Sequence, residues 1–61
     1  MKASKAIKLL NVFEKKAVKK HNIEAVKYIS VIRLKFFNLA LKGEELNELT
    51  ANAILRIKDR I

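Results

Sequence analysis

Helix breakers are almost absent from this chain, and their absence constrains its fold more than any other feature. The 61 residues include no Pro and one Gly, at position 43. Ala, Leu, Lys and Glu, all good helix formers, are prominent throughout. No two-residue hairpin turn and no sustained alternation of apolar and polar residues occurs. The sequence therefore predicts an all-α fold.

Two points divide the chain into helices. At His21-Asn22, Asn can adopt the left-handed conformation at a helix end or cap the next helix. This break is the weaker one, and a continuous helix through it is the alternative. At Gly43 the residue suits the position just after a helix, and acids follow it. We expect a small three-helix bundle, a helical hairpin plus a third helix, in one domain over 1–61, with helices at about 4–20, 23–42 and 45–60.

The chain is short for a self-sufficient domain. A fold of this size buries only about 60% of its unfolded surface, and such folds often need a disulfide, a metal or a partner chain. There is no Cys, and the single His, at position 21, has no acidic cluster around it. We therefore expect no metal site and no cofactor. A homodimeric helical bundle is the alternative to a monomer.

Positive charge is concentrated in the first two predicted helices. The net charge of the chain is +8, from fourteen Lys and Arg against six Asp and Glu. Residues 1–42 hold eleven basic and two acidic residues, a net charge of +9, and residues 43–61 hold three basic and four acidic, a net charge of −1. A field of this sign and size favours polyanions such as nucleic acid, anionic membranes or acidic proteins.

The helix predicted over 4–20 has one apolar side and one side that carries only lysines. Spacings of four and three residues put the apolar residues on one face, and these are Ala6, Leu10, Phe13 and Ala17. The opposite face holds no acid, although a solvated helix face usually mixes Glu and Lys. The candidate nucleic-acid-binding residues are the lysines of this face and its end: Lys5, Lys8, Lys15, Lys16, Lys19 and Lys20.

A one-sign face about 20 Å long matches several successive phosphates of a nucleic acid backbone. We therefore expect a small basic nucleic-acid-binding or regulatory protein that contacts DNA or RNA phosphates through this face. The alternative interpretation of the same lysines is a face that serves only for solubility. The contacts would be to phosphates, so the expected sequence specificity is low.

The helix predicted over 23–42 is apolar around most of its circumference, and such a helix is normally covered on more than one side. The alternative function is therefore a protein-interaction or inhibitor module that docks through this helix. Arg33 lies within its apolar side, where an unpaired charge would cost several kcal/mol. We expect it to pair with Glu14 or Glu48, or to act as a specificity residue at an interface. The candidate interface residues are Arg33, Phe36 and Phe37.

A third hypothesis is a leaderless, cationic, membrane-active peptide of the bacteriocin kind. The absence of Trp counts against it, as does the 45–60 helix, which is not basic. Lys8 interrupts the only apolar run that could belong to a leader, and no segment has the roughly twenty apolar residues of a membrane span. We expect a cytoplasmic protein.

Catalytic and DNA-reading motifs are missing from the sequence. It has no phosphate loop, zinc-ligand spacing, nucleophile–base pair or carboxylate dyad, so we expect no enzyme. Gly43 could supply the turn of a helix-turn-helix. The helix after it begins with Glu44, Glu45 and Glu48, however, and these acids would face phosphates, so we reject that motif.

Overall fold

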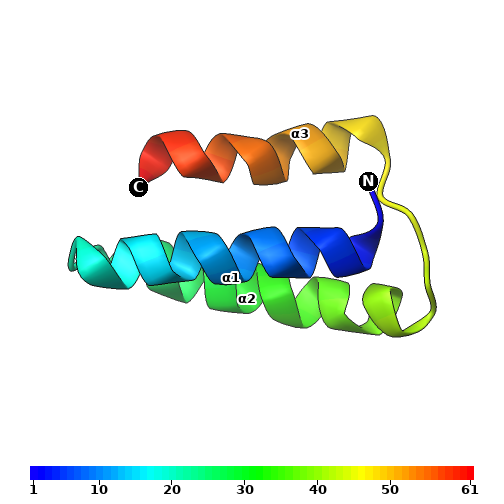
Figure 1. Cartoon of the computed structure of the whole chain (residues 1–61), viewed down its shortest axis with the longest axis horizontal. Helices are drawn as coiled ribbons and strands as arrows, with labels where there is room; N and C mark the ends of the chain where they lie inside the picture. The colour runs from blue at the N-terminus through cyan, green and yellow to red at the C-terminus, as the bar shows by residue number, and fades with distance from the viewer.

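Three helices account for most of the chain. The structure, a computed structural model, describes all 61 residues. Helix α1 and helix α2 pack as an antiparallel hairpin, and α3 lies beside α1 and runs in the same direction (Figure 1). The prediction of a small all-α bundle is confirmed. The elements are α1 at Ala3–Lys19, α2 at Ile23–Leu41, α3 at Glu48–Ile57 and a final 3₁₀ turn, η1, at Lys58–Arg60.

The turn between α1 and α2 depends on one residue in the left-handed conformation. His21 has a φ of 57°, and its backbone N–H donates to the Val18 carbonyl oxygen at 3.0 Å. Asn22 then caps α2, because its Oδ1 accepts a hydrogen bond from the Ala25 backbone N–H at 3.2 Å. The break predicted at these residues is confirmed, and the continuous helix is wrong. The left-handed residue is His21 and the cap is Asn22.

The connection from α2 to α3 is tied to the start of the chain. Gly43 has a φ of 69°, a conformation that costs Gly little. The residues after it are extended, and Lys2 and Glu45 form an isolated antiparallel bridge. The Leu46 backbone N–H donates to the Met1 carbonyl oxygen at 2.8 Å. This pairing holds the beginning of α3 against the beginning of α1.

Helix α3 begins at Glu48, three residues later than the predicted start at 45. The backbone of Glu45 and Leu46 is engaged in the pairing with the first residues, so it cannot be helical. Asn47 then caps the helix, since its Oδ1 accepts from the Thr50 backbone N–H at 2.8 Å. The last predicted turn, at residues 58–60, is 3₁₀ rather than α.

The core is small and entirely apolar. Ten of the 61 residues are buried, and none of them is polar. Half of them come from one side of α1, which is the predicted apolar side extended by Ala3, whereas α2 contributes only Ile29. The buried residues are Ala3, Ala6, Leu10, Phe13, Ala17, Ile29, Leu46, Ala51, Ile54 and Ile57.

The buried side of α3 is not the one that the spacing of its apolar residues indicates. Leu49, Ala53 and Ile57 recur at intervals of four, but only Ile57 is buried, and Leu49 is 82% exposed. Ala51 and Ile54 complete the buried side. Leu46 is also buried, but it lies in the extended segment before α3. Its position therefore does not indicate which side of the helix faces the core.

His21 gives a test of the first turn. Replacement of His21 by Gly should raise the free energy of unfolding by about 0.5–1 kcal/mol, because Gly adopts a positive φ without a Cβ clash. Replacement by Val should lower it by roughly 1 kcal/mol, because β-branched residues resist this conformation. Urea unfolding followed by circular dichroism measures both. Equal stabilities of the two variants would contradict the role given to this residue.

Candidate nucleic-acid interface

Five lysines of α1 form one continuous exposed surface. It lies on the side of the helix away from the buried residues Ala6, Leu10 and Ala17. The interval from its first to its last residue corresponds to about 21 Å at a rise of 1.5 Å per residue. Val12, 49% exposed, lies in its middle. We call this surface the lysine ribbon, and it consists of Lys5, Lys8, Lys15, Lys16 and Lys19.

Lys20, the sixth predicted residue, has a different environment from the ribbon. Its Nζ donates a hydrogen bond to the Ile61 carbonyl oxygen at 2.8 Å. Nearby, the Asn22 side chain donates to the Arg60 carbonyl oxygen at 3.5 Å. Lys20 therefore helps to hold the last residues of the chain against the α1–α2 turn, and it is not grouped with the five others.

No acid neutralises the lysine ribbon. The one ion pair in the structure joins Arg33 and Glu14, and no lysine takes part in it. Lys15 and Lys19 are four residues apart, and Lys16 and Lys19 are three apart, so these like charges oppose helix formation by about 0.2–0.5 kcal/mol per pair. A bound polyanion would remove this repulsion.

The helix dipole explains only part of the ribbon. Lys16 and Lys19 lie in the last turn of α1, where cations interact favourably with the carbonyl end of the helix. Lys5 lies in the first turn, which holds no acid, and here a cation is unfavourable. Lys8 follows one turn later and gains nothing from either end. The structure therefore shows no interaction by which Lys5 or Lys8 stabilises the folded state.

Arg33 links α2 to α1 through two residues of α1, Glu14 and Asn11. Its Nη2 lies 2.9 Å from Glu14 Oε2, and its Nη1 donates to Asn11 Oδ1 at 2.9 Å. Ser30 Oγ donates to the same Glu14 oxygen at 3.3 Å. The predicted pairing of Arg33 is thus made with Glu14 and not with Glu48. It turns the only acid of α1 toward α2 and leaves the ribbon free of negative charge.

The environment of Glu14 lowers the pKa of its carboxyl below the ordinary value of 4.5. The main cause is the hydrogen bond that Arg33 donates to the carboxylate. Burial acts in the opposite direction, while the charge of Arg33 and the hydrogen bond from Ser30 lower the pKa further. The ionised form of Glu14 is therefore the form that stabilises the hairpin.

The predicted interface residues do not share one surface. Phe36 is half-buried and lines a groove of about 200 Å³ between α2 and α3, together with Tyr28 and Ile32. Phe37, the next residue, is 53% exposed on another side of α2. Arg33 is engaged within the chain, as described above. Adjacent residues on a helix point about 100° apart, so Phe36 and Phe37 could not have lined the same flat surface.

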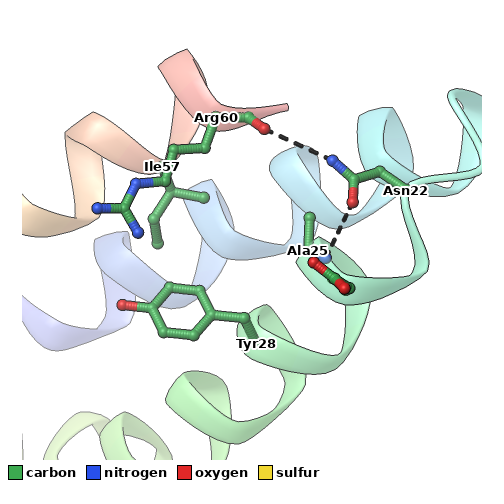
Figure 2. A pocket seen from close by; sticks show the side chains of 6 residues that line it. Asn22, Ala25, Tyr28, Ile57 and Arg60 are labelled. Atoms are coloured by element: carbon green, nitrogen blue, oxygen red, sulfur yellow. Dashed lines mark hydrogen bonds between the residues drawn. The ribbon is translucent and has the colours of Figure 1, made fainter.

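The largest hollow, about 360 Å³, lies where the start of α2 meets the end of the chain. Asn22 spans it, because its side chain contacts both the Arg60 carbonyl oxygen and the Ala25 backbone N–H (Figure 2). The Tyr28 ring lies below Ile57 and Arg60 in the same view. This site was not anticipated, since α3 and α2 meet here through tertiary contacts that no local sequence pattern reveals. No three His, Cys, Asp or Glu side chains gather anywhere in a metal-binding group.

Comparison with known proteins gives no assignment. No family model matches the chain, and neither a curated protein nor a solved structure matches it. None of the three helices combines the length and the apolar character needed to cross a membrane. The chemistry of the surface is therefore the basis for a functional proposal.

The Arg33–Glu14 pair predicts a pH dependence of stability. Because the folded-state pKa of Glu14 is depressed, its contribution is present above pH 4.5, the ordinary pKa of the carboxyl, and is lost as the pH falls through the folded-state value. Glu14→Gln should lower the free energy of unfolding by about 0.5–1 kcal/mol near neutral pH. The wild type and the variant should converge in acid. Chemical unfolding across this range measures the difference.

A double-mutant cycle isolates the pair. Arg33→Met should cost a similar amount, and Glu14→Gln should add little in its presence, because the coupling is already lost. Additive effects of the two substitutions would show that the contact contributes nothing to stability.

Proposed function

We propose that the protein binds nucleic acid through the lysine ribbon of α1, with the lysine ammonium groups on the phosphates. The observation that carries the proposal is a row of five exposed lysines, about 21 Å long, with no acid and no ion-pair partner. Lys5 and Lys8 give the strongest support to the proposal, because neither the helix dipole nor a neighbouring charge explains why a lysine occupies these positions. A polyanion supplies the missing negative charge.

The distribution of the acids supports a defined orientation on such a partner. Three exposed acids, Glu44, Glu45 and Glu48, occur along the connection from α2 to α3 and at the start of α3. Charge of opposite sign on different parts of one small molecule steers its encounter with a polyanion. The ribbon is attracted, while the connection, which is paired with the residues at the start of α1, is repelled. The protein therefore approaches the phosphates with the part of α1 beyond its first turn.

Rigid support of the ribbon favours a duplex over a flexible single strand. Leu10, Phe13 and three alanines pack the buried side of α1 against the core, so the lysines project from a helix whose position is fixed. Contacts of this kind position the protein on the backbone and carry little sequence information. We therefore propose binding of double-stranded DNA or RNA with low sequence specificity.

Salt dependence tests the proposal directly. With five lysine–phosphate contacts, the slope of log K against log salt concentration should be roughly −4.5 for duplex DNA. Affinity should then fall roughly 500-fold between 50 and 200 mM salt. Fluorescence anisotropy of a labelled duplex of about twenty base pairs measures it. Failure to bind DNA and RNA duplexes even at low salt would overturn the proposal, and binding to anionic vesicles alone would point to a membrane surface.

Neutralisation of the ribbon gives the matched comparison. The double variant Lys8→Gln, Lys15→Gln should weaken binding at low salt and make the slope less steep by about 2. The control Lys35→Gln, Lys58→Gln removes the same charge from α2 and η1, outside the ribbon. It should keep the slope of the wild type. Equal effects of the two double variants would show that binding follows net charge and not the ribbon.

A further inference from the structure

Large apolar side chains are exposed on one side of α2, one at its start and three in its second half. Ile23 is 66% exposed, Leu34 74%, Phe37 53% and Leu41 71%. They lie on the side of the helix away from Ile29, its one buried residue. Neither α1 nor α3 covers them. Singly exposed apolar residues need no explanation, but four on the same side of one helix indicate a contact surface.

The spacing of these residues is that of a coiled-coil seam. Together with Lys27 and Ser30, they follow at intervals of four, three, four, three and four, the alternation that keeps a stripe facing a partner helix. Ser30 brings no unsatisfied polar group to the stripe, since its hydroxyl already contacts Glu14 and the Val26 carbonyl oxygen. We call this surface the α2 seam, and it consists of Ile23, Lys27, Ser30, Leu34, Phe37 and Leu41.

The α2 seam is complementary to itself in the antiparallel direction. The intervals read the same from either end, so a reversed copy places Ile23 against the partner's Leu41 and Ser30 against the partner's Leu34. Lys27 then lies opposite the partner's Phe37, and an ammonium group placed over the face of that ring is attracted to it. A parallel copy would place Lys27 against the partner's Lys27, and this like-charge contact opposes it.

The surface area of the chain agrees with a missing partner. A folded monomer of 7.0 kDa is expected to expose about 4,000 Å². This chain exposes 4688 Å², roughly 700 Å² more than that expectation. A standard interface buries about 800 Å² on each partner. The excess thus has the size of one side of a stable interface.

From these observations we infer that the protein is a homodimer whose two α2 helices pair in antiparallel orientation through the α2 seam. Arg33 borders the seam, but its charge is already compensated by Glu14 at 2.9 Å. The lysine ribbon lies on α1 and contributes no residue to the seam. The net charge of +8 on each chain opposes association, so the apolar contacts of the seam have to outweigh this repulsion.

Sedimentation equilibrium without nucleic acid tests the dimer. The wild type should sediment as two chains of 7.0 kDa each. Leu34→Lys places a charge at the centre of the seam and should weaken dimerisation at least a hundredfold. Leu49→Lys is the matched control, because Leu49 is a still more exposed leucine on α3, and it should stay dimeric. A monomeric wild type up to millimolar concentration, or equal effects of the two variants, would overturn the inference. Circular dichroism verifies that both variants are folded.

Disulfide trapping tests the orientation of the two helices. The chain has no native Cys, so only the introduced residues can form a cross-link. A mixture of the single variants Ile23→Cys and Leu41→Cys should form a cross-linked heterodimer on mild oxidation. Neither variant alone should cross-link efficiently, because the equivalent positions lie at opposite ends of an antiparallel pair. Efficient cross-linking of each variant with itself would indicate a parallel pair, and no cross-linking in any mixture would exclude the seam.

Discussion

The buried side of α1 is the constraint on which the rest of the structure depends. It supplies five of the ten buried residues, and both other helices pack against α1. Three of the five, Ala3, Ala6 and Ala17, are small enough for neighbouring backbone to approach closely. Since this side is fully engaged, the opposite side is free of any packing role and can consist of lysines. The core and the proposed binding surface are therefore the two sides of one helix, and the first holds the second in place.

Local periodicity predicted α1 well because its side chains repeat at helical spacing and its partners cover one side only. The pairing of Arg33 with Glu14 was also accessible, since a charge within an apolar side needs an acid nearby. The start of α3 was not, because it depends on the bridge between Lys2 and Glu45, which are 43 positions apart. The sequence likewise indicated that α2 is covered on more than one side, but it could not show that the chain itself leaves the α2 seam open.

The lysine ribbon and the α2 seam lie on different helices and share no residue. In the proposed dimer each copy contributes its own ribbon, and two sets of five lysines act together. Weak phosphate contacts from one copy then gain from the effective concentration that the other provides. This arrangement relates the two unusual surfaces of the chain to one another. In the proposed dimer the α2 seam holds the two copies together, and both lysine ribbons take part in binding.

Helix α3 is attached mainly through its two ends. Its beginning is held by the backbone pairing of Leu46 with Met1, and the residues that follow it are held by Lys20 and Asn22. Between these points it contributes only Ala51, Ile54 and Ile57 to the core and borders the groove along α2. Because α3 packs much less extensively against α1 than α2 does, it opens at a lower free energy than the whole fold. The amide protons of α3 should therefore exchange with solvent as a group, through a sub-global opening in which α1 and α2 remain paired and the lysines keep their places.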